Sequence, residues 1–353
     1  MSPDFWSGKT VFLTGHTGFK GSWLSLWLQQ LGASVHGFSL HPSTAPALYE
    51  VANVAQGMNS TVADVRNLVA LQAAMKECRP DIVFHLAAQA IVRRSYDDPV
   101  DTLSTNIMGT VNVLESARSV DSVRAIVNVT SDKCYENCEW QKGYVESDPM
   151  GGHDPYSVSK GCSELVTSAY RRSFFAESGV SVASARAGNV IGGGDWATDR
   201  LVPDILRAID AGSRLRIRNP NAVRPWQHVL EPVSGYLFLA ERLYDQGQAF
   251  AEAWNFGPND EDAKSVSWVA EKLTSEWGEI DPWNQDHGQN PHEAQYLKLD
   301  ISKTLSRLGW APRWDISTAL RSIIVWHRAW LEGQNMRGVC VDQISDFSRA
   351  AQN

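Results

Sequence analysis

A glycine-rich segment near the start of the chain constrains the fold more than any other feature. A short apolar run at 10–14 precedes it, and apolar residues at helical spacing follow it from Trp23 to Leu31. The segment itself reads Gly15-His16-Thr17-Gly18-Phe19-Lys20-Gly21. Glycines at i, i+3 and i+6 allow a tight turn, a close approach of backbone to a pyrophosphate, and close packing of the helix on the strand. The order strand, glycine turn, helix therefore favours dinucleotide binding over a glycine turn that holds no ligand.

Strand and helix patterns alternate through the first half of the chain. We expect strands at about 34–40, 60–63, 81–85, 125–129 and 180–185, and helices at about 67–78, 99–119 and 155–175. Alternation of this kind is typical of βαβ units with a parallel sheet. The sequence therefore predicts an α/β fold built on a Rossmann-like, doubly wound parallel sheet.

After about residue 188 the pattern becomes irregular. It mixes helices with short strands, the helices at about 200–211, 232–244, 266–277, 302–308 and 316–331, and the strands at about 215–218, 253–256 and 296–299. We expect a dinucleotide-binding domain of residues 1–188 with returning segments at about 222–258. A smaller, C-terminal, mixed α/β substrate-binding cap would take about 189–221 and 259–335. Residues 336–353 are expected to be a C-terminal tail of unknown order.

Charge and composition exclude several classes of function. The net charge of −8 argues against non-specific binding of nucleic acid or of an anionic membrane surface, because both need a basic face. No stretch reaches the roughly 18 apolar residues of a membrane span, and the N-terminus lacks a charged region followed by an apolar run. The five scattered cysteines suit reduced thiols, and Cys134 and Cys138 have no partners at zinc-site spacing. We therefore expect a cytoplasmic protein without a metal site.

A tyrosine and a lysine stand four residues apart where the helix at about 155–175 begins. Pro155 fits a helix start, and positions i and i+4 share a face, so Lys160 can reach the side chain of Tyr156. A phenol has a pKa near 10, so making it a base at neutral pH needs about 4 kcal/mol of selective stabilisation. One ammonium at about 4 Å supplies roughly that at an effective dielectric constant of about 20. The alternative is an ordinary helix with one polar edge, since this pair alone is a common pattern.

The end of the second strand bears on the choice of cofactor. This position usually carries an acidic residue that binds the adenosine ribose, but Ser39 and His41 stand there. No arginine is present to meet a 2′-phosphate either. The sequence therefore leans towards NAD over NADP without settling the choice.

Polar residues gather after two later strands. Thr130-Ser131-Asp132-Lys133 follows the strand at 125–129, and a glycine-dense loop at 186–195 follows the next strand. In open parallel sheets, ligands lie at the carboxyl ends of the strands, so these side chains would face a substrate. A capped loop is the alternative. Asn106, on the helix at 99–119, either is a satisfied core amide or braces the active site.

Together these motifs resemble the extended short-chain dehydrogenase/reductase family, the NAD-dependent epimerases/dehydratases. The resemblance covers nearly the whole chain and includes the glycine turn, Asp64-Val65, Leu86-Ala87-Ala88, Asn106 and the Tyr156/Lys160 pair. Four longer stretches, at 14–28, 129–135, 186–196 and 224–232, are similar to the branch of the family that dehydrates CDP-D-glucose. That branch serves deoxysugar biosynthesis for bacterial surface polysaccharides such as the O-antigen of lipopolysaccharide.

The resemblance implies two sets of binding residues. The NAD contacts would come from Gly15, His16, Thr17, Gly18, Phe19, Lys20, Gly21, Ser39, Asp64, Val65, Leu86, Ala87, Ala88, Gln89, Asn106, Thr130, Tyr156 and Lys160. The CDP-D-glucose contacts would come from Gln89, Ser131, Asn189, Asp195, Arg200, Arg224 and Trp226. Arg224 is the first choice for phosphate, because a guanidinium fork matches phosphate oxygens. A surface position for Arg200 and a packed position in the cap for Trp226 are the alternatives.

The resemblance also implies an internal redox cycle. Tyr156, held anionic by Lys160, takes the proton of the sugar C4 hydroxyl as hydride leaves C4. Lys133 then removes the C5 proton, Asp132 protonates the departing C6 hydroxyl, and Ser131 stabilises the developing C4 oxyanion. Relatives that act on dTDP-glucose have Thr-Asp-Glu where this chain has Ser131-Asp132-Lys133, so here a lysine replaces the glutamate base. An amine accepts a proton only if its pKa falls towards neutrality through burial or a nearby positive charge.

Other functions stay open at this point. Another nucleotide-sugar 4,6-dehydratase or a 4-epimerase would share NAD, Tyr156 and Lys160, but an epimerase needs no acid/base pair such as Asp132 and Lys133. A non-catalytic NAD-binding regulator would be expected to lack the tyrosine, the lysine or the glycines, and all are present. The resemblance finally implies a homo-oligomer, a dimer or a tetramer, that pairs the long helices near Asn106 and after Tyr156.

Overall fold

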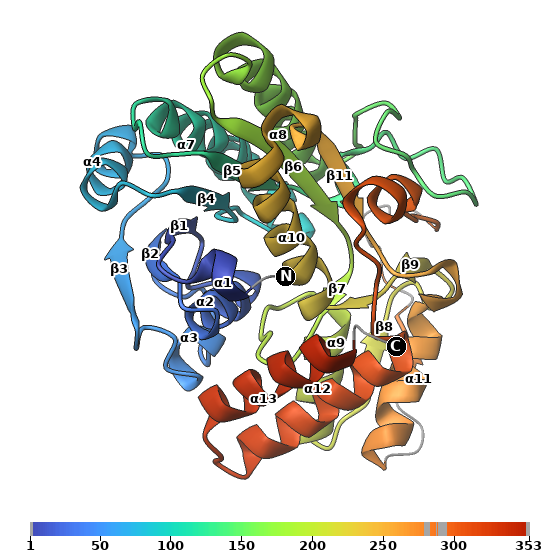
Figure 1. The fold of residues 1–353 in the computed structure, drawn as a ribbon. Helices are drawn as coiled ribbons and strands as arrows, with labels where there is room; N and C mark the ends of the chain where they lie inside the picture. The colour runs from blue at the N-terminus through green and yellow to red at the C-terminus, as the bar shows by residue number, and fades with distance from the viewer. Residues whose placement is uncertain (1–2, 279–282, 287, 289–294, 351–353) are drawn as a thin grey trace.

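The computed structural model describes residues 3–278, 283–286, 288 and 295–350. At its centre lies a seven-stranded sheet in which every neighbouring pair is parallel (Figure 1). In spatial order its strands are β11 (Ala253–Phe256), β6 (Ser181–Ala187), β5 (Ala125–Val129), β4 (Ile82–His85), β1 (Thr10–Thr14), β2 (Ser34–Ser39) and β3 (Met58–Val62). The predicted doubly wound parallel sheet is confirmed.

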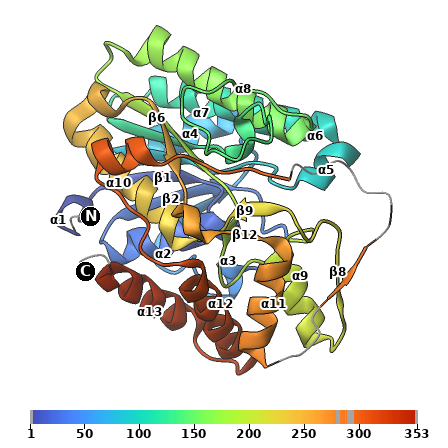
Figure 2. The same cartoon turned by 90° about the vertical axis from the view of Figure 1, so that its right-hand side faces the viewer.

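Helices cover both faces of this sheet (Figures 1 and 2). One layer contains α2 (Phe19–Gln30), α10 (Leu230–Gln246) and α13 (Met336–Arg349), and the other contains α4 (Leu68–Cys78), α7 (Gly109–Arg118) and α8 (Pro155–Tyr170). Alternate residues of β1 enter opposite cores, with Val11 and Leu13 in the first layer and Phe12 in the second. A parallel sheet buried on both faces needs apolar residues on both, which explains the unbroken apolar runs of its central strands.

The strand order reverses between β1 and β4. Thr14 at the end of β1 pairs in register with His85 at the end of β4. The chain leaves these neighbouring strands towards opposite faces of the sheet, because α2 and α7 lie in different layers. Crevices at such reversal points, beyond the carboxyl ends of the strands, are where ligands bind in this architecture.

The helix expected at 99–119 is built from three joined segments. α6 (Pro99–Leu103) leads into the π-helical turn η1 (Ser104–Met108), which leads into α7. α8 similarly continues into the π-helical turn η3 (Arg171–Phe175). A π-helical turn adds a residue to the helix and often occurs at functional sites, and η1 carries Asn106.

The remaining elements include the irregular cap beside the sheet (Figure 2). The cap contains three small strand pairs, β7 with β10, β9 with β12 and β8 with β13. Its helices α9, α11 and α12 pack around their own apolar cluster, which includes Ile205, Leu273 and Leu320. These and the other elements are α1 (Pro3–Trp6), α3 (Leu48–Val51), α5 (Val92–Asp97), η2 (Asp132–Cys134), β7 (Val190–Ile191), α9 (Leu201–Asp210), β8 (Leu215–Ile217), β9 (Val223–Pro225), β10 (Gln227–His228), η4 (Gly247–Phe250), η5 (Asp260–Asp262), β12 (Ala263–Ser265), α11 (Val266–Trp277), β13 (Trp283–Gln285), η6 (Thr304–Leu308) and α12 (Ile316–Leu331).

Two expectations about the C-terminal part differ from the structure. The strand expected at 296–299 is absent, and Tyr296 and Leu299 make only isolated bridges, to Val223 and Tyr144. Leu297 and Leu299 are instead buried against the loop that carries Tyr144, so packing and not a sheet produced their alternation.

The segment set apart as a C-terminal tail forms helix α13. Cys340, Ile344 and Phe347 follow one another at helical spacing and join the main core, where Phe347 meets the ring of Trp27 edge-on at 5.7 Å. The last part of that tail, 351–353, lies outside the described residues. Within the described ranges, no helix has the length and apolar character that crossing a membrane requires.

Candidate active site

In the glycine turn after β1, the backbone of Gly15 lies close to the backbone at the end of β4 and to that of the first turn of α2. Gly15 has a positive φ of 78°, and a Cβ on it would lie 2.7 Å from the backbone nitrogen of Ala87 at the end of β4. A Cβ on Gly21 would overlap the carbonyl oxygen of Gly15. Two of the three glycines are thus required by the turn and by the packing of α2 on it.

Gly18 is different, because protein atoms do not crowd it. A Cβ there would meet only the Gly15 oxygen, at 3.4 Å. Gly18 is exposed and is the N-cap of α2, with no side chain bonded to the first-turn N–H groups. Helix N-termini with unbonded N–H groups attract phosphate, so this point fits the pyrophosphate of a dinucleotide.

The side chains around this turn connect it to β2 and β3. Thr17 Oγ1 lies 2.9 Å from Ser39 Oγ, and His16 Nε2 lies 2.7 Å from Ser60 Oγ. The imidazole of His16 occupies the space over Gly37 of β2. Burial lowers the pKa of His16 to about 4, so this ring is neutral at physiological pH.

Asp64 and Val65, which were expected among the NAD contacts, both contact neighbouring residues of the protein. The carboxylate of Asp64 accepts hydrogen bonds from Arg66, and this pairing outweighs burial and lowers the pKa of Asp64. Val65 is buried against Gly109 of α7, and Asn112 donates to its carbonyl at 3.0 Å. Phe19 similarly packs against the main core.

Asn106 joins the loop after β4 to the start of α8. Its Oδ1 accepts from Gln89 N at 2.9 Å, and its Nδ2 donates to Gln89 O at 3.0 Å and to Ser159 Oγ at 2.8 Å. Asn106 is therefore both a hydrogen-bonded core amide and a brace for the site, because its buried side chain joins the loop after β4 to α8. In the same loop, Leu86 and Ala87 donate their N–H groups to Thr14 Oγ1, and Ala88 precedes Gln89.

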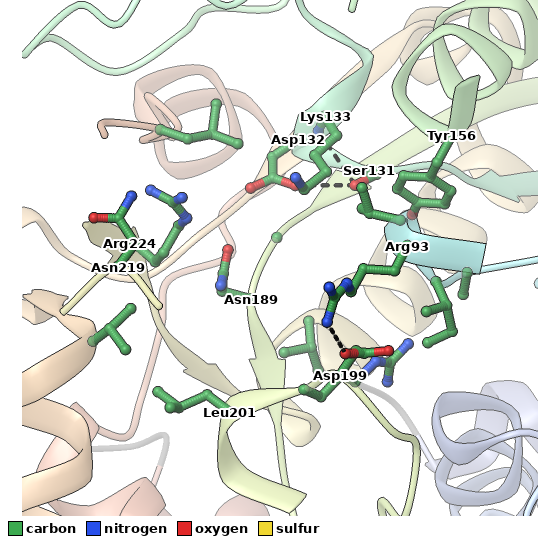
Figure 3. A pocket seen from close by; sticks show the side chains of 18 of the residues that line it. Arg93, Ser131, Asp132, Lys133, Tyr156, Asn189, Asp199, Leu201, Asn219 and Arg224 are labelled. Atoms are coloured by element: carbon green, nitrogen blue, oxygen red, sulfur yellow. Dashed lines mark hydrogen bonds and ion pairs between the residues drawn. The ribbon is translucent and has the colours of Figure 1, made fainter. Parts of the chain in front are cut away.

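The polar residues after β5 converge with the start of α8 (Figure 3). Ser131 Oγ donates to Asp132 Oδ1 at 3.0 Å and accepts from Lys133 N at 3.2 Å, and Tyr156 lines the same cavity. Ser131, Asp132 and Tyr156 are all buried, whereas the Lys133 side chain is partly open to the cavity. Thr130, one residue earlier, points away and donates to Glu164. A hydroxyl, a carboxyl, an amine and a phenol thus share one small site.

Tyr156 and Lys160 lie one turn apart near the start of α8. The side chain of Asp154 caps this helix by accepting from Ser157 N, and Pro155 opens its first turn. Burial raises the pKa of Tyr156 to about 12 although the neighbouring Ser131 side chain opposes this shift, and burial lowers the pKa of Lys160 to about 8. Lys160 Nζ donates to Val129 O at 3.4 Å. In the protein alone, burial thus dominates both groups and keeps the phenol protonated.

A buried ion pair that we did not predict joins β6 to α8 next to this site. Arg186 of β6 contacts Glu164 of α8 at 2.8 Å, and both side chains are about 5% exposed or less. Glu164 also accepts from Thr130 and Ser184, and Arg186 also donates to the hydroxyl of Tyr135. Burial raises the pKa of Glu164, but the charge of Arg186 more than offsets this, so the carboxylate stays ionised.

Four of the five catalytic candidates, Ser131, Asp132, Lys133 and Tyr156, line a cavity of about 560 Å³ that continues towards the cap, whereas Lys160 is not among its lining residues. Lys20 reaches this cavity from the first turn of α2. Burial and, to a lesser degree, the positive charges of Arg200 and Lys160 lower the pKa of Lys20 to about 7. Cations that repel one another around a cavity fit an anionic ligand, which would relieve the repulsion.

Five of the expected substrate contacts from beyond β6 line this cavity: Asn189, Asp195, Arg200, Arg224 and Trp226. Asn189 lies near the middle of the view in Figure 3 and has a left-handed φ of 44°. Arg200 contacts the buried carboxylate of Asp195 at 2.9 Å, so it is not a free surface residue. Trp226 is 5% exposed and packs in the cap core, and its indole donates to Lys264 O at 2.9 Å. Gln89 is not among the lining residues, because its side chain binds Thr102 and Ile91.

Several lining residues lie outside the set of expected substrate contacts. Arg93 of α5 contacts Asp199 at 3.0 Å, and Arg218 approaches the same carboxylate at 3.8 Å, which links the Rossmann part to the cap beside the cavity (Figure 3). Arg216 and Asn219 also line it. The two arginines at 216 and 218 alternate along the expected strand at 215–218, and that spacing was the available signal.

Three features together define an extended short-chain dehydrogenase/reductase: the parallel sheet whose strand order reverses between β1 and β4, the glycine turn, and the tyrosine and lysine on one helix. The solved structure of a dTDP-glucose 4,6-dehydratase from Bacillus anthracis in complex with NAD has a TM-score of 0.77 at 19% identity, covering 94% of this chain and all of that one. A UDP-glucose 4-epimerase from Thermotoga maritima with UDP-glucose has a TM-score of 0.79 at 22% identity, covering 91% and 99%.

Sequence similarity narrows the class to a family. The family of GDP-mannose 4,6 dehydratase matches residues 12–323. A CDP-glucose 4,6-dehydratase from Salmonella typhimurium is 53% identical over 355 aligned residues, which cover 99% of each chain. This protein belongs to the GDP-mannose 4,6-dehydratase family.

Proposed function

We propose that this protein is a CDP-D-glucose 4,6-dehydratase, which converts CDP-D-glucose to CDP-4-keto-6-deoxy-D-glucose and water. The observation that carries the proposal is the 53% identity, across 99% of both chains, to a relative of that name. The convergence of Ser131, Asp132 and Lys133 on Tyr156 supports it independently, because dehydration needs an acid and a base beyond the tyrosine.

NAD is the proposed cofactor. The exposed Gly18 at the N-terminus of α2 fits its pyrophosphate, and the closely packed Gly15 and Ala87 fit a cofactor that lies against the backbone. Ser39, which stands at the end of β2 where an acidic residue is usual, is proposed for the adenosine side. When bound, NAD supplies the acceptor and then the donor of a hydride.

The residues of the chain then move the protons. As a phenolate, the form that the positive charges of Lys160 and of bound NAD would favour, Tyr156 accepts the proton of the C4 hydroxyl, and the resulting C4 ketone acidifies the C5 proton. Lys133 removes that proton and later returns it to C5, and Asp132 gives a proton to the C6 hydroxyl, which leaves as water. Ser131 stabilises the charge that develops on the C4 oxygen. Arg224 and Arg200 are proposed to bind the pyrophosphate of the substrate, because both line the same cavity as the acid/base pair.

The test follows a deuterium atom placed on C4 of CDP-glucose. We expect the label to appear on C6 of the 4-keto-6-deoxy product, as observed by NMR, because one hydride leaves C4 and arrives at C6. A 4-epimerase would return the label to C4 and keep the C6 hydroxyl, and a non-catalytic regulator would leave the sugar unchanged. Either result would remove the dehydratase assignment.

A homodimer is part of the proposal. Leu165 and Val158 of α8 stand seven residues apart on one helical face and are 59% and 39% exposed. Val100 and Met108, on the adjoining α6 and η1, are 75% and 48% exposed. Apolar side chains gathered on neighbouring helices favour association, here with the same face of a second copy.

A cytoplasmic location is proposed from the state of the cysteines. All five cysteines are free in the structure, which is consistent with the reducing conditions of the cytoplasm. The 4-keto-6-deoxy product is the kind of intermediate from which deoxysugars of surface polysaccharides are made, as the resemblance implies.

A further inference from the structure

The segment that carries the proposed acid and base, residues 130–135, is bonded to the rest of the protein by side chains at both of its ends. Thr130 is its first residue, and its hydroxyl donates to Oε1 of Glu164 on α8. Tyr135 is its last residue, and its hydroxyl accepts from Nη1 of Arg186 on β6 at 2.7 Å. Arg186 Nη2 in turn contacts Glu164 Oε2 at 2.8 Å. One buried ion pair therefore binds both ends of the segment.

The shape of the Arg186 side chain makes this connection rigid. A guanidinium is planar and its N–H groups point in fixed directions, so the bond of one nitrogen to Glu164 fixes where the other nitrogen meets Tyr135. The guanidinium also lies over the ring of Tyr135, with its central carbon 4.9 Å from the ring centroid. The hydroxyl of Tyr135 donates its own proton to Asn255 Oδ1 at 2.7 Å. All of these side chains are buried, so bulk water has little access to the bonds.

The side chains of the proposed acid and base are not bonded to other parts of the protein in this way. The hydroxyl of Ser131 donates to Asp132 Oδ1 and accepts from Lys133 N, but both bonds are internal to the segment. Asp132 Oδ2 is buried with no hydrogen-bond partner among the described residues. The positions of both side chains therefore depend on how the segment at 130–135 is held.

The helix that carries Tyr156 has supports that are separate from the ion pair. Asn106 Nδ2 donates to Ser159 Oγ at 2.8 Å, and Asp154 caps the first turn of α8. Loosening the segment at 130–135 should thus leave the proposed proton transfer from the C4 hydroxyl in place.

We propose that the ion pair of Glu164 and Arg186 positions Asp132 and Lys133 for the elimination of water, by holding both ends of the segment that carries them. Neither member of the pair lines the cavity, so they are positioning residues that act through others. A displacement of a reacting group by about 1 Å can lower a rate by about 10²-fold. The inference rests on the proposed dehydratase function, because only elimination uses the acid and the base.

The test separates oxidation from elimination in single-turnover reactions with CDP-glucose. Absorbance follows reduced cofactor, and rapid quenching with mass spectrometry follows the 4-keto-6-deoxy product. Thr130→Val and Tyr135→Phe each remove one anchor and leave the ion pair intact. We expect each to slow product formation by about tenfold to 10²-fold. Reduced cofactor should form at the wild-type rate and accumulate, because oxidation does not use the displaced groups.

A third variant tests the ion pair itself. Removing either charge would leave its partner buried and unpaired, which is strongly destabilising. Arg186→Lys keeps the charge but lacks the planar fork, so it should show the same selective loss of elimination. Two controls should react as the wild type does. Thr130→Ser keeps the anchoring hydroxyl, and Ser184→Ala removes a different bond to Glu164 Oε2, from a residue of β6 outside the segment.

Equal slowing of oxidation and elimination would overturn the proposal, because the ion pair would then support the fold as a whole. Unchanged product formation in Thr130→Val and Tyr135→Phe would overturn it as well. Failure of the dehydratase assignment is distinguishable, since the wild-type enzyme would then form no 4-keto-6-deoxy product.

Discussion

The carboxylate of Asp132 fills the space directly beside the Cα of Gly188, so that a Cβ on residue 188 would overlap Asp132 Oδ2. Gly188 follows β6, whereas Asp132 follows β5 on the neighbouring strand. The absence of a side chain at 188 thus allows the proposed acid to hold its buried position.

Replacing this glycine should therefore displace the acid. We expect Gly188→Ala to lower dehydratase kcat by about 10²-fold or more, the usual contribution of a general acid. Oxidation at C4 should persist, so reduced cofactor should accumulate with CDP-glucose, as followed by absorbance. Gly161→Ala is the matched control, because a Cβ there meets no atom closer than 3.4 Å. Full activity of Gly188→Ala would show that the position of Asp132 is not critical.

Lys133 is the proposed base for the C5 proton, and its removal should separate the two halves of the reaction. In Lys133→Met we expect C4 to be oxidised but C5 to keep its proton, so that reduced cofactor and a 4-keto sugar accumulate. Turnover should fall by about 10²-fold to 10⁴-fold. Solvent deuterium should not enter C5, as measured by NMR. The exposed Lys142→Met in the same region is the control, and normal turnover of Lys133→Met would remove Lys133 from the mechanism.

Glu231 should make the stability of the protein depend on pH. Its carboxylate is buried on α10 and accepts N–H bonds from Arg313 and Trp314, but burial dominates and raises its pKa from 4.5 to about 8. Between those values the folded state holds a proton that the unfolded state has released, so stability falls as pH rises. The slope for this one group is at most about 1.4 kcal/mol per pH unit.

The measurement compares urea unfolding of the wild type and Glu231→Gln between about pH 5 and pH 8. Glutamine does not titrate, so the wild type should lose stability relative to this variant as pH rises. The exposed Glu77→Gln should follow the wild-type curve. A constant difference between the wild type and Glu231→Gln would contradict the raised pKa.

The exposed apolar face of α8 predicts the effect of a charge on association. We expect Leu165→Glu to shift the protein from dimer to monomer, because a buried, unpaired carboxylate is costly at an interface. Light scattering coupled to size exclusion measures the mass directly. Leu331→Glu is the control, since Leu331 is also about half exposed but lies at the end of α12. An unchanged mass for Leu165→Glu would place any interface elsewhere.

The central fold could be predicted because its signals are local. The glycine turn, the apolar strands and the start of α8 at Pro155 each depend on residues close in sequence. Gly15 and Gly21 also act as the spacing indicates, since both positions exclude a Cβ. Local chemistry of this kind survives folding because it agrees with the global architecture.

The rest depended on contacts between distant residues. Glu164 and Arg186 stand 22 positions apart, and only the packing of α8 on β6 reveals that they form a buried pair. The π-helical turn that carries Asn106 adds a residue to the helix, which the apolar periodicity does not report. The alternation at 296–299 arose from packing against Tyr144, and α13 was missed because its apolar positions are few.

The central claim is the identity of the substrate and the reaction. The most direct measurement incubates the purified protein with CDP-glucose, dTDP-glucose, UDP-glucose and GDP-mannose in parallel, and follows 4-keto-6-deoxy product by NMR and net reduced cofactor by absorbance. We predict product from CDP-glucose alone, with no net reduction of NAD. Dehydration of a different nucleotide sugar, or of none, would contradict the account.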